Sequence, residues 1–252
     1  MDNNVRRIGV IAPPGNVAVE REFPLFVPKG VVLNHNRLSR PNSIQTQESI
    51  LAMNNSLELA AQNLAQAYPE VITYACTGGS FLEGIGNEST PADRIRKATG
   101  IPGVSTSVAV VQALRALGAQ KVVLIAPYPY DIMACELKFL EHYGFTVTAW
   151  NTFNCLTSEE NRKLSSEQIA ERVLANREAI AASDAVFVSC TNILVMDQIE
   201  RLERELQRPV VTSNQATLWA VFAQMNLDSR GLHGGRLFEE HSPAVSASAV
   251  SA

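Results

Sequence analysis

The sequence predicts an α/β protein made of two pseudo-symmetric Rossmann-like halves, each a parallel four-stranded sheet flanked by helices, with the site in the cleft between them. Short apolar runs bounded by turn-forming residues, typical of buried strands, alternate with segments of helical spacing. The run Lys121–Pro127 (KVVLIAP) repeats Ile8–Pro13 (IGVIAP), and Ala185–Ile193 (AVFVSCTNI) repeats Val71–Ser80 (VITYACTGGS). Both pairs are offset by 114 residues, which indicates an internal duplication.

The first half begins with a buried-strand pattern that ends in Pro-Pro-Gly-Asn, a strong loop signal. Its later strands are followed by helical patterns, as parallel sheets require. Ser43 is the expected cap of the longest helix. The expected strands are Ile8–Pro13, Val31–His35, the run before Cys76 and Ile101–Val104, and the expected helices are Gln45–Tyr68, Pro91–Thr99 and Ser107–Leu117.

The second half restarts the same order at Lys121. Gly144 is expected to end the first helix of this half. Acidic Glu167, in the first turn of the second helix, favours that helix. The expected strands are Lys121–Pro127, Thr146–Trp150, the run before Cys190 and Pro209–Thr212, and the expected helices are Asp131–Tyr143, Ser166–Ala182, Val195–Gln207 and Gln215–Met225.

The duplication predicts the domain organisation. We expect residues 1–117 plus 213–240 to form the first half, because the final helix should pack back on it, and residues 118–212 to form the second half. From Glu239 onward the sequence is rich in Ala, Ser and Val and lacks helix punctuation. Residues 241–252 are therefore expected to form a flexible tail.

Composition limits the possible partners. The 252 residues carry a net charge of −4, which gives no electrostatic reason to expect nucleic acid or an anionic membrane as a partner. The apolar run near the N-terminus is cut short by Pro13 and Pro14, so neither a signal peptide nor a membrane span is expected. The cytoplasm is the default location, and the four cysteines are expected to be reduced thiols.

Two cysteines are presented in the same way from the two halves. Cys76 and Cys190 each end a strand pattern and precede Thr. Ligands of parallel sheets bind beyond the carboxyl ends of the strands, where Asn16, Cys76, Tyr128 and Cys190 should lie. Backbone N–H groups near a helix N-terminus favour the thiolate, so we expect lowered thiol pKa values. The alternative is that each cysteine is only a small buried hydrophobe.

Other chemistries fit the sequence less well. There is no CxxC or HxxxH motif for a metal and no GxSxG elbow for a serine hydrolase. Thr77-Gly78-Gly79-Ser80 lacks the Gly-Lys-Ser/Thr of a phosphate-binding loop, and its expected use is to bind a carboxylate through backbone donors. Asn16 could be only a turn residue and Tyr128 only core packing.

The chain resembles the aspartate/glutamate racemase superfamily, and within it the branch of maleate cis–trans isomerases and arylmalonate decarboxylases. The resemblance runs from Arg6 to about Glu240 and includes IGVIAPPGNVAVE, YACTGGSF, ATGIPGVSTSVAVVQALRALGAQKVVLIAPY, VSCTNI, RPVVTS and GRLFEE. It implies a cofactor-independent, metal-free reaction in which isomerases and racemases use two cysteines, whereas the decarboxylase keeps only the second. Cys76 and Cys190 place this chain on the isomerase or racemase side, although the ALRALG motif resembles the decarboxylase.

The resemblance also implies roles for single residues. Asn16 and Tyr128 would each hold a substrate carboxylate, and Asn161 would contact substrate. Backbone or side-chain donors would come from Thr77, Thr191 and Asn192. The expected substrate is a small dicarboxylate or a substituted malonate, and a homo-oligomer is left open. The expected function is isomerisation of maleate to fumarate, and the alternatives are racemisation, decarboxylation and non-catalytic carboxylate binding.

Overall fold

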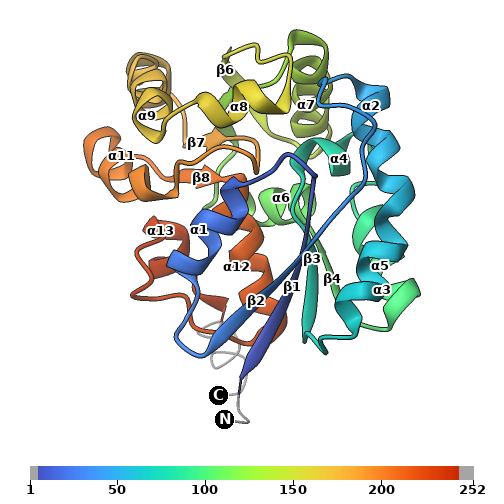
Figure 1. Cartoon of the computed structure of the whole chain (residues 1–252). Coiled ribbons are helices and arrows are strands. Elements are labelled where there is room, and N and C mark those ends of the chain that lie inside the picture. The colour runs from blue at the N-terminus through green and yellow to red at the C-terminus, as the bar shows by residue number, and fades with distance from the viewer. Residues whose placement is uncertain (1–4, 244–252) are drawn as a thin grey trace.

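The computed structural model describes residues 5–243, which form two four-stranded parallel sheets (Figure 1). The strand order is β2-β1-β3-β4 in the first sheet and β6-β5-β7-β8 in the second, so equivalent strands occupy equivalent positions. The predicted fold class is therefore confirmed. The strands are β1 (Arg6–Ala12), β2 (Val31–Arg37), β3 (Val71–Tyr74), β4 (Gly103–Ser105), β5 (Lys121–Ala126), β6 (Thr146–Thr152), β7 (Ala185–Val188) and β8 (Val210–Thr212).

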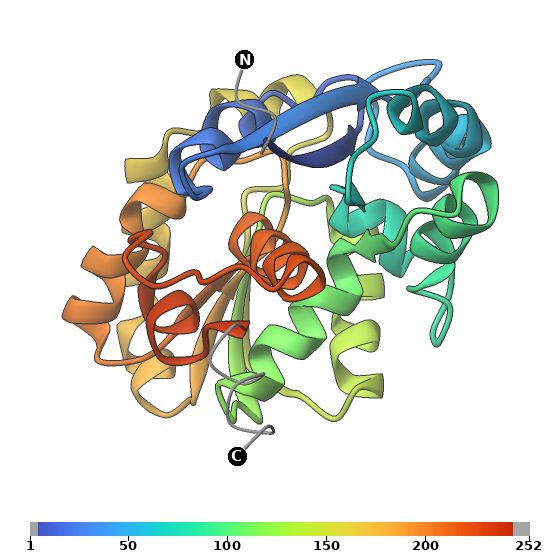
Figure 2. The same cartoon turned by 90° about the horizontal axis from the view of Figure 1, so that it is seen from below.

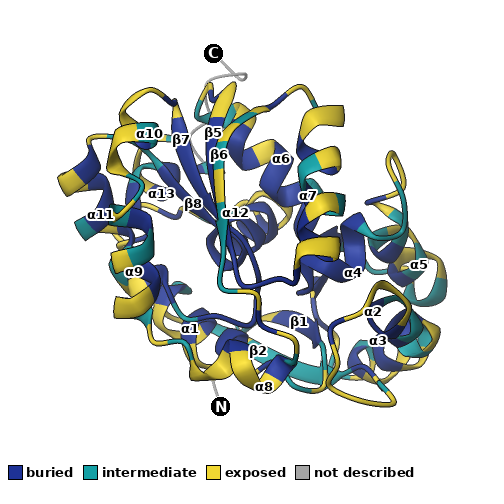
Figure 3. Cartoon of the chain, turned by 90° about the horizontal axis from the view of Figure 1, so that it is seen from above, coloured by how far each residue is buried: buried dark blue, intermediate teal, exposed yellow. Residues whose placement is uncertain are grey.

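Helices cover both sheets, as the alternating pattern predicts. In Figure 3 the strands β7 and β8 are buried, whereas the outward sides of α7 (Tyr130–His142), α9 (Ser166–Leu174) and α11 (Ile199–Leu206) are exposed. The helices up to β5 are α1 (Ala18–Phe26), α2 (Gln47–Ala52), the 3₁₀ turn η1 (Met53–Ser56), α3 (Leu57–Ala65), α4 (Thr77–Phe81), α5 (Thr90–Thr99) and α6 (Thr106–Ala116). After β5 come α7 (Tyr130–His142), α8 (Ser158–Lys163), α9 (Ser166–Leu174), α10 (Arg177–Ala181), η2 (Met196–Gln198), α11 (Ile199–Leu206), α12 (Ser213–Met225) and α13 (Gly235–Glu240).

Three helices predicted as continuous are broken in the structure. The segment 45–68 is divided into α2, η1 and α3, and its cap is Thr46, whose hydroxyl accepts a hydrogen bond from the Ser49 N–H, rather than Ser43. Segment 166–182 is divided into α9 and α10, and segment 195–207 into η2 and α11. The spacing of apolar residues continues across such breaks because each shorter helix buries the same side. The apolar pattern alone therefore does not reveal where a helix is broken.

Helices α1, α4, α8 and α13 were not predicted. Helix α1 contains Pro24, which normally ends a helix because it lacks an N–H donor. Its buried side chains, Val19, Phe23 and Phe26 among them, compensate through packing. Helix α8 begins with a capping box in which Thr157 and Glu160 satisfy each other's backbone N–H groups.

Helix α12 joins the two halves. It is buried on nearly all sides, and it lies beside α6 in the middle of the molecule (Figure 2). It also contacts β3 and β4 of the first sheet and β8 of the second. Helix α13, in contrast, packs on α11 and β8, so this part of segment 213–240 lies with the second half. The division of the chain near residue 118 stays a prediction.

Two residues of the predicted tail are hydrogen-bonded to the rest of the protein. The Trp219 indole donates to the His241 carbonyl at 2.7 Å, and the buried Ser242 hydroxyl donates to Asp228 at 2.7 Å. These hydrogen bonds connect His241 and Ser242 to α12 and to the loop after it, and the flexible tail stays a prediction. Residues 244–252 lie outside the described part of the chain.

Between residues 5 and 243, no helix combines the length and apolarity needed to cross a membrane.

Candidate active site

Cys76 lies where β3 ends and α4 begins. It has extended backbone angles and caps the helix, and its sulfur accepts a hydrogen bond from the Gly79 N–H at 3.2 Å. Only glycine fits at position 79, because a Cβ there would lie 1.9 Å from the Tyr74 hydroxyl and 3.1 Å from the Cys76 sulfur. The Thr-Gly-Gly sequence thus allows the first turn of α4 to close around the thiol.

Cys190 occupies the equivalent position after β7. Its sulfur accepts a hydrogen bond from the Asn192 N–H at 3.3 Å, and its own N–H donates to the Ser213 hydroxyl at 3.0 Å. The backbone φ of Cys190 is +105°, a left-handed conformation that is rare outside glycine. Such a conformation costs about 1–3 kcal/mol and clusters at functional sites.

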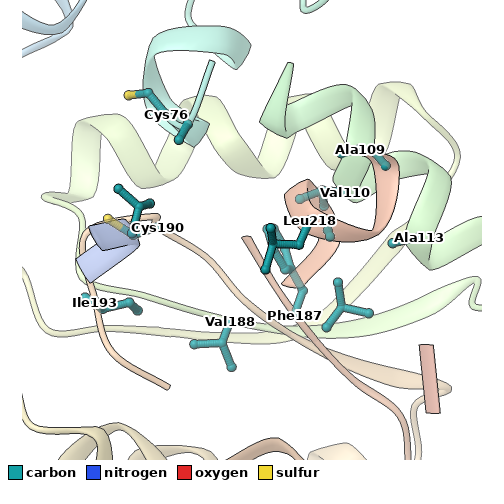
Figure 4. Packing of buried hydrophobic residues seen from close by; sticks show 14 of the residues in the cluster. Cys76, Ala109, Val110, Ala113, Phe187, Val188, Cys190, Ile193 and Leu218 are labelled. Atoms are coloured by element: carbon teal, nitrogen blue, oxygen red, sulfur yellow. The ribbon is translucent and has the colours of Figure 1, made fainter. Parts of the chain in front are cut away.

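The two cysteines line one pocket. Figure 4 shows their side chains on the same side of the apolar core formed by Phe187, Val188 and Leu218, and each comes from a separate chain segment. The pocket encloses about 380 Å³ of empty space, part of which opens to solvent. Its lining residues are Pro13, Arg40, Gln45, Ile50, Met53, Cys76, Thr77, Gly78, Tyr128, Ser158, Asn161, Cys190, Thr191 and Asn192.

Hydrogen bonds fix the two cysteine turns to each other across the halves. The Thr77 hydroxyl donates to the Ser213 hydroxyl at 2.8 Å, and Ser213 also holds the Cys190 N–H. From the other side, the Thr191 hydroxyl donates to the Ala75 carbonyl at 2.9 Å. These buried contacts set the relative position of the two thiols.

Asn16 does not line the pocket. It is fully buried, its amide donates to the Thr191 hydroxyl at 3.0 Å, and its oxygen accepts from the N–H groups of Ala18 and Val19. Asn16 thus supports the Thr191 turn and the start of α1. A direct bond from Asn16 to a substrate carboxylate stays a prediction.

The remaining predicted site residues lie at the pocket. Tyr128 is buried and packs its ring edge-on against Phe81, with 6.1 Å between the ring centroids. The Asn161 amide donates to the Cys190 sulfur at 3.7 Å. The Asn192 side chain is engaged elsewhere, because it accepts from the Val17 N–H and donates to the Ser158 carbonyl. Their roles toward a substrate stay predictions.

Six lining residues were not predicted. Arg40 and Gln45 follow β2, and Ile50 and Met53 follow them along α2 and η1, with the others at Pro13 and Ser158. Gln45 donates to the Asn161 side-chain oxygen at 3.0 Å, which links the two halves on this side. One signal was present in the sequence: the loop after a second parallel strand reaches the same sheet edge as the loops after the first and third.

The expected lowering of the Cys76 pKa is wrong in net direction. Burial raises the pKa of Cys76, while the Gly79 N–H, the Arg40 guanidinium and the Tyr74 hydroxyl act to lower it. The predicted N–H donor is therefore present, but the loss of water around the buried sulfur outweighs it.

Cys190 departs further from an ordinary thiol. Burial raises the pKa of Cys190 to about 12, and the Asn192 N–H and the Tyr128 hydroxyl only partly oppose this. No cation acts on it as Arg40 acts on Cys76 among the residues that the structure describes. The two thiols are therefore unequal: Cys190 is suited to remain protonated, whereas Cys76 has a guanidinium to stabilise its thiolate.

A buried carboxyl group lies behind this part of the site. Glu136 on α7 is fully buried, and its Oε1 accepts from the Ser189 hydroxyl at 2.5 Å. Within residues 5–243 its Oε2 has no hydrogen-bond partner. Burial raises the pKa of Glu136 to about 8, so the folded protein holds this proton at neutral pH.

This group should make stability fall with rising pH. An ordinary glutamic acid has a pKa of 4.5, so between 4.5 and about 8 the folded state binds a proton that the unfolded state has lost. The stabilisation is complete below about pH 4.5 and is lost toward pH 8, by up to about 5 kcal/mol. We expect Glu136→Gln to reduce this loss in denaturant unfolding at several pH values, and Glu141→Gln, on the exposed side of α7, to leave it unchanged. An unaltered pH slope in Glu136→Gln would contradict the assignment.

The fold and the site define a class of protein: duplicated α/β halves that place one cysteine each in a shared pocket. A family model described as arylmalonate decarboxylase matches residues 8–238. The chain therefore belongs to the arylmalonate decarboxylase family, and the resemblance stated from its motifs is confirmed.

Relatives in this family carry two different activities. The maleate isomerase of Nocardia farcinica is 30% identical over 97% of this chain and 99% of its own length. The arylmalonate decarboxylase of Bordetella bronchiseptica is 29% identical over 92% and 96%. Among solved structures, a variant of the Nocardia farcinica maleate cis–trans isomerase with a covalently bound succinylcysteine intermediate has a TM-score of 0.86 and 26% identity, covering 94% of this chain and 99% of that one.

Proposed function

We propose that the protein is a cofactor-independent isomerase of a small dicarboxylic acid that converts maleate to fumarate. The observation that carries this proposal is the presence of two thiols, Cys76 and Cys190, from equivalent turns in one pocket. Similarity to a maleate isomerase along nearly the whole chain supports it, as does the succinylcysteine intermediate in a related structure.

Addition of Cys76 to the alkene is the first step. The thiolate forms an S–C bond to one alkene carbon as the π bond breaks, and the electron pair moves to the other carbon and into its carboxylate. The first turn of α4 leaves the N–H groups of Thr77 and Gly78 without intrahelical partners at the pocket. Together with the Tyr128 hydroxyl, these donors would stabilise the developing negative charge.

Rotation and elimination complete the reaction. The former double bond is now single, so the two carboxylates rotate apart, and the electron pair then re-forms the double bond and expels the Cys76 thiolate. Cys190, from the opposing half, would give the carbanion a proton and take it back, or shield it from water. Electrons and protons balance without a cofactor.

Decarboxylation of a substituted malonate is the second candidate. The family description and the apolar wall formed by Ile50 and Met53 favour it, because such a wall accommodates an aryl group. In this reaction loss of CO₂ leaves a carbanion that Cys190 protonates. The presence of Cys76, which this reaction does not use, favours isomerisation instead.

One NMR assay in D₂O separates these functions. Separate samples contain maleate, phenylmalonate and aspartate, each with wild-type protein and with Cys76→Ala. Isomerisation predicts fumarate from maleate with the wild type alone. Phenylacetate formed by both proteins would identify the decarboxylase, loss of the aspartate α-proton signal a racemase, and unchanged spectra with a bound dicarboxylate a carboxylate-binding protein.

A further inference from the structure

Arg40 lies in the loop between β2 and α2 and lines the pocket. It is half-buried, and its guanidinium is close enough to Cys76 for the two charges to interact. Contacts on three sides hold it in place: its Nε donates to the Ser49 hydroxyl at 2.9 Å, its Nη1 to the Ser158 hydroxyl at 3.2 Å, and its Nη2 to the Ile44 carbonyl.

These contacts leave part of the guanidinium unused. An arginine has five N–H donors, and each of the three contacts uses one of them. One N–H remains on each terminal nitrogen, and both can donate to the oxygens of a carboxylate.

Arg40 also lacks a negatively charged partner. Two other partly buried arginines are paired with carboxylates, Arg37 with Glu20 and Arg94 with Glu58, both at 2.6 Å. The partly buried Arg172 and Arg208 instead donate to amide and carbonyl oxygens, but neither lines the pocket. Within residues 5–243 no carboxylate oxygen lies within 4.0 Å of the Arg40 nitrogens. A guanidinium stays charged in proteins, so burying it without a counter-ion is costly unless a ligand supplies the charge.

We infer that Arg40 binds the second carboxylate of the substrate and so selects a dicarboxylate over an acid with an uncharged group at that position. This inference rests on the proposed function and identifies the part of the site that sets its substrate class. The donors of Thr77, Gly78 and Tyr128 receive one carboxylate, and Arg40 receives the other. Ile50 and Met53 then face the hydrocarbon part of the molecule.

The test compares maleate with maleamate, in which a neutral amide replaces one carboxylate. The variants are Arg40→Leu, the charge-conserving Arg40→Lys, and Arg96→Leu, which removes an exposed arginine of α5 outside the pocket. We expect the wild type and Arg96→Leu to prefer maleate by about 10- to 100-fold in kcat/KM. Arg40→Leu should abolish this preference by losing activity on maleate, and Arg40→Lys should keep part of it.

A second readout does not depend on turnover. Succinate bound in the pocket should protect Cys76 from alkylation by iodoacetamide, and the succinate concentration for half-protection should rise by about 10-fold or more in Arg40→Leu. Unchanged half-protection together with an unchanged maleate-to-maleamate ratio would overturn the inference. If the wild type isomerises neither substrate, the proposed function fails, and succinate protection still decides whether Arg40 binds a carboxylate.

Discussion

Cys76→Ala is expected to lower kcat/KM for maleate by on the order of 10⁴-fold or more, because it removes the nucleophile on which rotation depends. Cys76→Ser should be nearly as inactive, since a serine hydroxyl has no comparable anion at neutral pH. The measurement is fumarate formation by NMR. Cys135→Ala is the matched control, because Cys135 is a free thiol on α7 that does not line the pocket.

The wild-type rate should also depend on pH in a defined direction. Burial raises the pKa of Cys76, so the thiolate fraction and with it kcat/KM should increase as pH rises above neutrality.

A folded Cys76→Ala protein with a rate within about threefold of the wild type would contradict the nucleophile assignment.

Cys190→Ala is expected to lower kcat by about 10²- to 10⁴-fold, the range for loss of a general acid–base group. The pKa of Cys190 is raised to about 12, which keeps a proton on this sulfur at neutral pH for transfer to the carbanion. The proton-transfer role requires the loss to appear in kcat rather than KM. An increase in KM with kcat unchanged would instead indicate that Cys190 only contacts bound substrate.

The sequence was most informative where the chain repeats itself. The 114-residue offset between Cys76 and Cys190 predicted equivalent turns, and the structure places both at one pocket. It succeeded because strand ends and their side-chain types are local properties of the sequence. Tyr128 was predicted at the site from its place after a strand, Asn161 from family resemblance, and both line the pocket.

Contacts between distant segments were harder to foresee. Arg40 and Gln45 reach the pocket through a loop without regular structure, and Asn161 is presented by α8, which the sequence pattern did not reveal. Asn16 was predicted at the site, yet its amide and oxygen are used by Thr191 and by the start of α1. Thr191 lines the pocket, whereas its partner Asn16 does not. Which of these two polar side chains faces the pocket depends on packing between the halves, and the local sequence pattern does not determine this packing.

The thiol pKa values show the same limit. The N–H donors to both sulfurs were predicted and are present. The degree of burial, which raises both pKa values, is set by the whole fold around Cys76 and Cys190.

The most direct measurement of the central claim is mass spectrometry of Cys190→Ser after brief incubation with maleate and an acid quench. If the two cysteines act on one substrate from opposite sides, the protein should gain the mass of one maleic acid. Peptide mapping should place it on Cys76, and succinate should prevent its formation. An adduct on Cys135 or Cys155, or no adduct in a variant that still converts maleate to fumarate, would contradict the account.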